Sequence, residues 1–179
     1  DWSSDVCSSD LNDNEGTEYL LVANKRKLTA FHTSTLEMQL CLADNGSISA
    51  IAVCSSKGIV ATGHQTGQIT LWHGVNQWVR SKRAPTSSTM HWHAHAVADL
   101  AFSEDGNYLH SGGEEGVLAV WQLHTSKTGF VPRLGAAITS LAYCPWDAIC
   151  AVVCADNSVR LINIVGMQIG KHNCHYAYF

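Results

Sequence analysis

Hydrophobic residues in the middle of the chain fall into short runs that polar turns separate. Three runs have the length and the alternating or β-branched pattern of strands: Ala96–Phe102, Tyr108–Ser111 and Val117–Trp121. Two turn-forming segments, Glu104–Asn107 and Gly112–Gly116, lie between them. The pattern predicts three antiparallel strands in a meander, which a fourth strand from the following segment would complete.

The same pattern recurs along the chain without a gap. Counted from Leu100, the matching positions are Phe102, Ser111, Gly116 and Trp121; from Ile51 they are Val53, Thr62, Gly67 and Trp72; from Leu141 they are Tyr143, Val152, Asn157 and Ile162. The three anchors lie 49 and 41 residues apart, which brackets the repeat length of WD-type β-propeller blades. The sequence therefore predicts an all-β fold, a WD-repeat β-propeller with four-stranded blades.

The repeat divides the chain into unequal parts. Residues 12–44 form a partial blade, in which Tyr19–Ala23 and Lys27–His32 are strands with no first strand before them. Residues 45–90 form a blade with a basic loop insertion, residues 91–135 the best-formed blade, and residues 136–179 a blade whose pattern decays after Ile164. About three and a half blades are expected to form an open arc, because closed propellers need roughly four to eight.

Residues 1–11 differ from the rest of the chain. They are rich in Ser and Asp, show no strand or helix periodicity, and can be encoded by nucleotides that resemble a common sequencing-library adapter. We interpret them as an assembly artefact and leave them out of the fold prediction; a genuine disordered acidic terminus is the alternative. Without them the net charge changes from −4 to about −1, so the bulk charge does not indicate a nucleic-acid-binding protein.

WD-type blades usually bury a hydrogen-bonded tetrad of His, Ser or Thr, an acid and Trp. The best-formed blade matches it with His93, Ser111, Glu115 and Trp121, with Glu in place of Asp and with Trp92 where the pattern has Gly. A buried indole N–H, hydroxyl and imidazole must satisfy one another. The other blades keep partial tetrads: the second has Thr62 and Trp72 with Asp44 at the His position and Thr66 at the acid position, and the last keeps Asp156 with Ile162 in place of Trp.

Three histidines in alternation offer a competing interpretation. In an extended segment His91, His93 and His95 would share one face, which is a spacing that can hold a transition metal. The tetrad position of His93 favours a structural role, and no fourth ligand or general base lies nearby in the sequence. We therefore expect no metal and no cofactor, with a metal-dependent activity at this row as the alternative.

Two segments are candidate interaction surfaces. Arg80, Lys82 and Arg83 lie in an insertion that we expect to surround an outer strand at Trp78–Val79, with the tryptophan exposed. These cations can contact RNA phosphates, or they can simply keep a solvated loop and an edge strand soluble. The second segment follows Trp121 and contains Lys127, Phe130 and Arg133.

Other features of the sequence limit the classes of function that we expect. The six cysteines after residue 11 form no Cys-x-x-Cys pair, which indicates reduced, buried thiols rather than a zinc site. No nucleophile elbow, phosphate-binding glycine loop or His-Glu-x-x-His motif is present in the sequence, and no apolar run reaches transmembrane length. We expect a protein that is not an enzyme, has no small-molecule substrate and does not enter a membrane.

Four segments resemble one particular WD-repeat family. They are ATGHQTGQITLW (Ala61–Trp72), MHWHAHAVADLAFS (Met90–Ser103), HSGGEEGVLAVWQ (His110–Gln122) and FVPRLGAAI (Phe130–Ile138). In these segments the chain is similar to a fragment of the WD-repeat subunits of the nucleolar small-subunit processome, in its transcription-associated subcomplex. The HWH before the strand and the PRLG after the blade are the most specific features.

The resemblance implies a non-enzymatic scaffold in the nucleus and nucleolus that acts in pre-rRNA transcription and processing. Its partners would be other processome proteins, with a pre-rRNA or small nucleolar RNP contact as a further possibility. A generic WD-repeat peptide-binding or adaptor module is the alternative. The ubiquitin-ligase adaptor form is disfavoured, because Trp72 and Trp121 are not followed by its Trp-x-Arg pattern.

Overall fold

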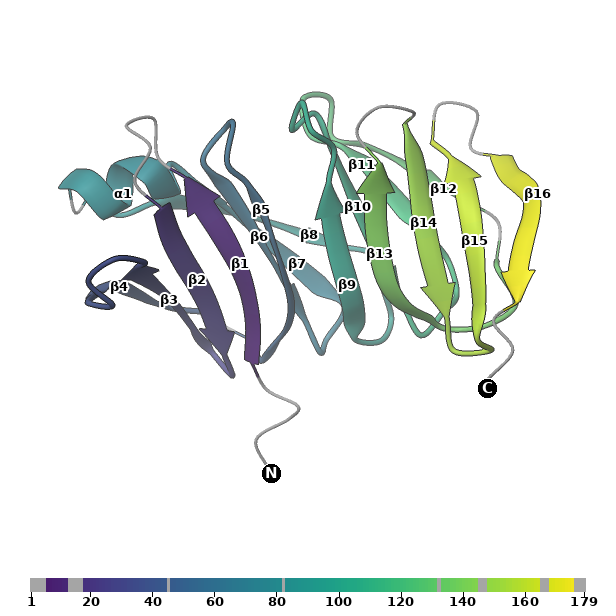
Figure 1. The fold of residues 1–179 in the computed structure, drawn as a ribbon, viewed down its shortest axis with the longest axis horizontal. Coiled ribbons are helices and arrows are strands. Elements are labelled where there is room, and N and C mark those ends of the chain that lie inside the picture. The colour runs from purple at the N-terminus through teal and green to yellow at the C-terminus, as the bar shows by residue number, and fades with distance from the viewer. Residues whose placement is uncertain are drawn as a thin grey trace.

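The structure is a computed structural model that describes residues 6–12, 18–44, 46–81, 83–131, 133–144, 148–164 and 168–175. Its sixteen strands form four antiparallel sheets of four strands each, and every sheet is a meander in chain order (Figure 1). The first sheet holds β1 (Val6–Asn12), β2 (Glu18–Asn24), β3 (Lys27–His32) and β4 (Met38–Ala43). The second holds β5 (Ile48–Cys54), β6 (Ile59–His64), β7 (Gln68–His73) and β8 (Thr86–His91). The third holds β9 (Val97–Phe102), β10 (Tyr108–Gly113), β11 (Ala119–Gln122) and β12 (Lys127–Phe130), and the fourth β13 (Ile138–Cys144), β14 (Ile149–Cys154), β15 (Ser158–Asn163) and β16 (Gln168–His175).

The four sheets follow one another side by side in chain order, from purple to yellow in Figure 1. The first strands of consecutive sheets are in contact, β1 with β5, β5 with β9, and β9 with β13. The sheets do not close into a ring. The predicted all-β fold of four-stranded propeller blades in an open arc is confirmed, with four sheets instead of about three and a half.

The hydrophobic core lies between neighbouring sheets, because alternate residues of the inner strands face each way. Leu21 of the first sheet and Val60 of the second are fully buried in one cluster. Leu71 and Leu100 share the next cluster, between the second and third sheets. A third cluster between the third and fourth sheets is built from apolar side chains that include Leu118, Val120, Ile138, Val152 and Ile162. Each fully buried aliphatic side chain contributes roughly 1.5–3 kcal/mol relative to exposure.

Both ends of the chain hold strands that the sequence pattern does not predict. The prediction leaves residues 1–11 out of the fold and places no strand before Tyr19–Ala23, yet β1 pairs with β2 along its whole length and Leu11 is fully buried. The sequence pattern decays after Ile164, yet β16 pairs with β15, with a register irregularity between Arg160 and Ile162. The physical reason is the same at both ends. The outer strand of a meander leaves a row of unpaired backbone groups, and an adjacent segment can satisfy them whatever its side-chain pattern.

The insertion in the second sheet also differs from its prediction. An outer strand was expected at Trp78–Val79, but the segment forms helix α1 (Val75–Ser81), and β8 is the outer strand. Val75 and Trp78 lie three residues apart, so a helical turn buries both on one face, at 0% and 5% exposure. Trp78 is therefore a core residue and is not exposed. In the described part of the chain, no helix is long and apolar enough to cross a membrane.

Two glycines allow neighbouring sheets to approach closely. Gly67 in the β6–β7 turn has φ +81°, and a Cβ atom there would overlap the backbone carbonyl of His93, in the segment that leads into β9. Gly116 in the segment between β10 and β11 has φ +66°, and its Cβ would collide with the carbonyl of Ala136. Both occupy the same repeat position. Glycine supplies the left-handed conformation and the space that this contact needs.

Candidate functional site

The third sheet brings the four predicted tetrad residues together. Trp121 Nε1 donates to Ser111 Oγ at 2.8 Å, His93 Nε2 lies 2.8 Å from the same oxygen, and His93 Nδ1 lies 3.3 Å from Glu115 Oε2. Ser111 and His93 are fully buried, and Trp121 is 8% exposed. Glu115 Oε1 also accepts the backbone N–H of His95 at 2.8 Å, so the longer Glu side chain anchors the segment that carries His93. The tetrad thus joins β10, β11, the turn between them and the segment before β9.

The hydrogen bonds of the tetrad form a one-way chain. The indole N–H donates to the Ser111 hydroxyl, the hydroxyl donates to His93 Nε2, and Nδ1–H donates to the Glu115 carboxylate. Burial lowers the pKa of His93 below its usual value, against the opposing attraction of Glu115, which fits a neutral imidazole. Burial alone would raise the pKa of Glu115, but backbone N–H donors and then His93 hold it below its usual value. Every donor in the chain therefore has an acceptor without a charged histidine.

In the second sheet, the equivalent residues form a shorter series of hydrogen bonds. Trp72 Nε1 donates to Thr62 Oγ1 at 3.1 Å, and Thr62 Oγ1 donates directly to Asp44 Oδ2 at 2.8 Å. Asp44, at the histidine position, is 6% exposed. His64 Nε2 approaches this carboxylate at 3.4 Å and Thr70 Oγ1 at 3.0 Å. The carboxylate that ends the network thus comes from the segment before the first strand, whereas Thr66, at the acid position, is exposed.

In the fourth sheet the position is apolar. Leu134, Val152 and Ile162 occupy the places of the histidine, the hydroxyl and the tryptophan, and they are 3%, 0% and 0% exposed. Asp156 is exposed and does not join a buried network. Its Oδ1 accepts both the N–H and the hydroxyl of Ser158 at 3.1 and 2.6 Å, and Arg160 Nη2 lies 3.3 Å from its Oδ2. Asp156 therefore stabilises the β14–β15 turn.

The histidine row does not form a shared face. Strand β8 ends at His91, so the alternation of an extended strand stops before His93. His93 points into the blade, whereas His91 and His95 are exposed, with His91 Nε2 3.2 Å from the carbonyl of Thr66 and His95 Nδ1 3.9 Å from Glu114 Oε2. The expectation that the three side chains share a face is wrong. Among the described residues, no group of three or more His, Cys, Asp or Glu is placed to hold a metal ion.

The first candidate interaction surface is described only in part. Arg80 lies in α1, but its side chain and all of Lys82 are outside the described residues. Arg83 is exposed and lines a hollow of about 270 Å³ together with His73, Gln77 and Thr86. The basic segment therefore lies beside the start of β8, at the end of the sheet where β7 stops.

The second candidate surface is divided between two ends of the third sheet. Lys127 begins β12 opposite Gln122, whereas Phe130 ends this strand opposite Ala119. The Phe130 ring lies 4.4 Å from that of Trp92, and the two are 41% and 40% exposed. Arg133 lines a hollow with Glu114 and Glu115. The structure thus brings Phe130 and Trp92 together and separates both from Lys127.

Sequence reasoning did not identify several residues of these networks. His64 and Thr70 join the polar network of the second sheet, and the exposed Trp92 pairs with Phe130. A possible signal for His64 and Thr70 was their alternation with the tetrad residues Thr62 and Trp72, since residues two apart on a strand share a face. No local signal connects Trp92 with Phe130, because Trp92 lies before the first strand of the third sheet and Phe130 ends its last strand.

Four-stranded meander sheets in sequence order, with a buried Trp–Ser–His–Glu chain in the best-formed sheet, define a WD-repeat β-propeller. Residues 13–157 match the family model described as the first β-propeller of WD repeat-containing protein 75. The chain belongs to this family.

Relatives with this family's name occur in several vertebrates. The chain is 38% identical to WD repeat-containing protein 75 of Xenopus laevis over 120 residues, which is 66% of this chain and 14% of that protein. It is 33% identical to the human protein of that name over 140 residues, 78% of this chain and 16% of the human protein. It is also 35% identical to U3 small nucleolar RNA-associated protein 17 of Schizosaccharomyces pombe over 125 residues, 70% of this chain and 15% of that protein. The chain thus spans about one-seventh of the length of these relatives.

A solved structure supports the fold. A chain in the crystal structure of a mitotic checkpoint complex superimposes with a TM-score of 0.74 at 20% sequence identity, covering 94% of this chain and 52% of that chain. At this level of identity the likeness concerns the fold alone.

Proposed function

We propose that the chain is part of a non-enzymatic WD-repeat scaffold of small-subunit ribosome biogenesis, acting in the nucleolus during pre-rRNA transcription and processing. The observation that carries the proposal is the family match over residues 13–157, together with a relative named for its association with U3 small nucleolar RNA. The tetrad supports a structural role for the buried polar residues. Its donors and acceptors satisfy one another inside the blade, which favours a rigid support for exposed loops.

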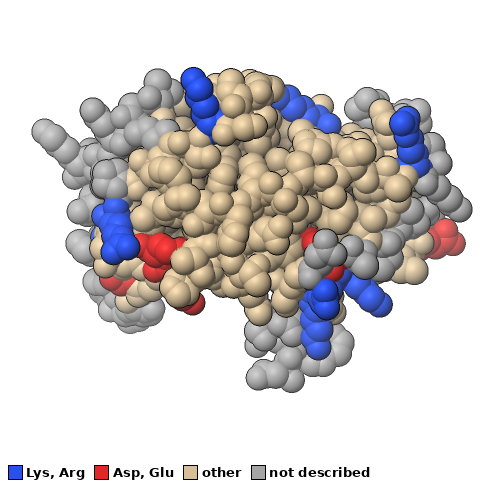
Figure 2. All heavy atoms as spheres, turned by 180° about the vertical axis from the view of Figure 1, so that it is seen from behind, with Lys and Arg blue, Asp and Glu red and all other residues tan. Residues whose placement is uncertain are grey.

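The partners in this proposal are other processome proteins. On the face shown in Figure 2, the Lys and Arg side chains of the described residues lie mainly at the periphery, and uncharged residues form the middle. A continuous basic surface is the usual footprint of a protein that binds nucleic acid through phosphates. This face therefore offers no continuous basic surface to RNA. The exposed Arg83 and the half-exposed aromatic pair Trp92–Phe130 are the protein contacts in this proposal.

Charge reversal tests the basic segment. We expect the triple variant R80E, K82E and R83E to reduce co-purification of other processome proteins with the tagged chain about tenfold, because it changes the sign of the charge beside β8. The matched control reverses three exposed cations at the β2–β3 hairpin, Lys25 and Arg26 in the turn and Lys27 at the start of β3, and should leave co-purification unchanged. An equal loss in both variants, or no loss in the first, would contradict a specific contact there. Crosslinked pre-rRNA recovered with the same samples measures the RNA contact separately.

A further inference from the structure

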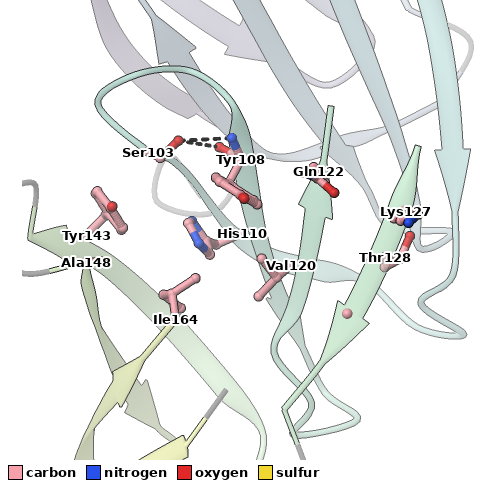
Figure 3. Close-up of a pocket in the computed structure, with 11 residues that line it drawn as sticks. Ser103, Tyr108, His110, Val120, Gln122, Lys127, Thr128, Tyr143, Ala148 and Ile164 are labelled. Atoms are coloured by element: carbon pink, nitrogen blue, oxygen red, sulfur yellow. Dashed lines mark hydrogen bonds between the residues drawn. The ribbon is translucent and has the colours of Figure 1, made fainter. Parts of the chain in front are cut away.

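Two hollows of the structure differ in the chemistry of their walls. The hollow between the third and fourth sheets measures about 420 Å³ and is lined mainly by apolar and aromatic surface (Figure 3). His110 in its wall is fully buried, and its Nε2, which has no partner among the described residues, is closed off from any ligand placed there. The hollow of about 270 Å³ beside β8 brings the guanidinium of Arg83, the imidazole of His73 and the amide of Gln77 around the hydroxyl of Thr86. None of the described residues that line this second hollow is a carboxylate.

Thr86 is one of two residues in the sequence that combine a hydroxyl with an arginine three positions before it. Arg83 precedes Thr86, and Arg26 precedes Thr29 at the same spacing. Protein kinases with an acidic substrate groove select this spacing, because the guanidinium pairs with carboxylates of the groove while the hydroxyl meets the γ-phosphate of ATP. The spacing alone does not separate the two threonines, so their places in the fold must be compared.

The two threonines differ in access. Thr29 lies in the middle of β3, where it is half-buried and pairs with Val22 on one side and Cys41 on the other. Thr86 is exposed and begins β8, the outer strand of its sheet, which pairs with β7 on one side. The next three residues of β8 are also exposed, so this end of the strand buries little apolar surface and opens locally at small cost. A kinase can therefore bind Thr86 without unfolding a blade.

The segment before Thr86 has the backbone that a substrate groove needs. Helix α1 ends at Ser81, and residues 83–85 belong to no helix or strand. Proline disfavours the α conformation at the residue before it, so Pro85 favours an extended backbone at Ala84 and prevents the helix from continuing into β8. Arg83 and Thr86 are thus presented three residues apart on an extended segment, which is the form in which a kinase groove takes a substrate.

We propose that Thr86 is a phosphorylation site for a protein kinase that selects basic residues before its acceptor, and that Arg83 and His73 hold the phosphate in the hollow beside β8. In the transfer, Thr86 Oγ1 forms a bond to the γ-phosphorus of ATP, and the bond from this phosphorus to the oxygen that bridges it to the β-phosphate breaks. The hydroxyl proton passes to a carboxylate of the kinase, and ADP leaves.

The register of the sheet places the phosphate beside its proposed partners. His73 lies opposite Thr86 in the β7–β8 pairing, so the two side chains share one face of the sheet. The imidazole extends along this face, with its Nε2 3.2 Å from Ser88 Oγ. Arg83 lines the same hollow, and a guanidinium binds phosphate oxygens in a two-pronged geometry.

The modification changes the charge of the basic segment. A phosphate adds roughly 1.5–2 negative charges near neutral pH, next to the three cations Arg80, Lys82 and Arg83. Phosphorylation therefore removes most of the positive charge of this segment. The proposal concerns the modification itself and does not depend on the scaffold function, so each can fail without the other.

Labelling of the 179-residue chain tests the site. The catalytic subunit of cyclic-AMP-dependent protein kinase, which selects arginines before its acceptor, should phosphorylate Thr86, as located by peptide mass spectrometry. R83Q should slow the initial rate about tenfold, the effect of one charge-assisted contact, and T86A should abolish the labelling. R26Q is the matched control, because it removes an exposed arginine at the same spacing before Thr29 and should leave the rate unchanged.

Two comparisons show whether the fold selects Thr86. A peptide of residues 23–33, which is free of the sheet, should be phosphorylated at Thr29, whereas the folded chain should not be. Equal labelling of Thr29 and Thr86 in the folded chain would overturn the proposal, and so would labelling of Ser87 and Ser88 as fast as Thr86. Tagged chain recovered from cultured animal cells in phosphatase inhibitors should carry phosphate at Thr86, and its absence there would overturn the proposal as well.

Phosphorus NMR tests the hollow. Hydrogen-bond donors from Arg83 and His73 favour the dianion of the phosphate, so phosphothreonine in the folded chain should titrate about half a pH unit or more below its value in urea. H73A should move the titration toward the value in urea. The matched variant H95A, which changes an exposed histidine before β9, should not move it. Equal titration in the folded chain and in urea would show that the hollow does not hold the phosphate.

Discussion

At the scale of the residue, three successive sheets fill one buried position in three ways. The third sheet uses an indole, a hydroxyl, an imidazole and a carboxylate; the second has no imidazole between the hydroxyl and the carboxylate; the fourth uses only aliphatic side chains. In both polar versions the chain of hydrogen bonds begins at a tryptophan N–H and ends at a carboxylate. A buried donor requires an acceptor, so a buried tryptophan N–H requires the polar side chains of the network. Where isoleucine replaces it, the polar residues are no longer needed.

This dependence predicts that the tetrad residues are coupled in stability. The variant S111V gives the third sheet the hydroxyl-position residue of the fourth sheet, but it leaves Trp121 Nε1 and His93 Nε2 buried without partners. We expect the free energy of unfolding to fall by about 2–3 kcal/mol. Adding His93→Leu should cost less in S111V than in the parent chain, because one orphaned group is removed. Denaturant unfolding measures all four species, with the exposed-site variant S87A as control. Strictly additive losses would contradict the coupling.

At the scale of the element, the sequence predicts best where side chains determine the structure. The offsets from Leu100 locate the first three strands of the second, third and fourth sheets, because buried positions repeat with a fixed spacing. Strands β1 and β16 escape prediction because their pairing depends on the backbone groups of the strand beside them. Helix α1 was not predicted because its buried face consists of Val75 and Trp78. Two apolar residues do not distinguish a helical turn from a strand.

The candidate site shows the same division. The four tetrad residues could be predicted because each stands at a fixed offset within one repeat, and the structure brings them within hydrogen-bond distance. The Trp92–Phe130 contact and the unpaired nitrogen of His110 could not. Both depend on how segments far apart in the sequence pack against one another, which no spacing within a repeat records.

The glycine turns make a prediction at the level of the element. Gly67→Ala must strain a turn at φ +81° and also push the new Cβ against the carbonyl of His93, in the segment that leads into the next sheet. We expect a loss of about 2–4 kcal/mol in the free energy of unfolding. Gly135→Ala is the matched control: it has φ +89° with no atom within 4 Å of its Cβ, so it carries the conformational strain alone, about 1 kcal/mol. Thermal or denaturant unfolding compares the two. Equal losses would show that the contact between the sheets contributes nothing.

At the scale of the whole molecule, the arc is held together by its first strands. Ser49 donates to the carbonyl of Val97 at 2.7 Å, which joins the second sheet to the third. Asp99 joins the third sheet to the fourth, because its Oδ2 accepts the N–H of Leu141 at 2.7 Å and the hydroxyl of Ser140 at 2.9 Å. The hydrophobic clusters between sheets are non-directional, so these polar contacts fix the register of one blade against the next.

Removing the Asp99 carboxylate should therefore loosen one junction and leave the others. The carboxylate accepts three donors, because its Oδ1 also accepts the N–H of Leu100 at 2.8 Å. In Asp99→Asn one of the two oxygens becomes an amide nitrogen, which cannot accept, so at least one of these donors loses its acceptor. We expect amide hydrogens of β13–β15 to exchange about five- to thirtyfold faster, which corresponds to roughly 1–2 kcal/mol, while the first sheet stays unchanged. Asp156→Asn is the control, since its bonds remain within one turn. Equal acceleration in all four sheets would show that the arc opens as one cooperative unit. In that case the sheet junctions would not set the stability of individual blades, and the blades of the wider family could not be treated as separable modules.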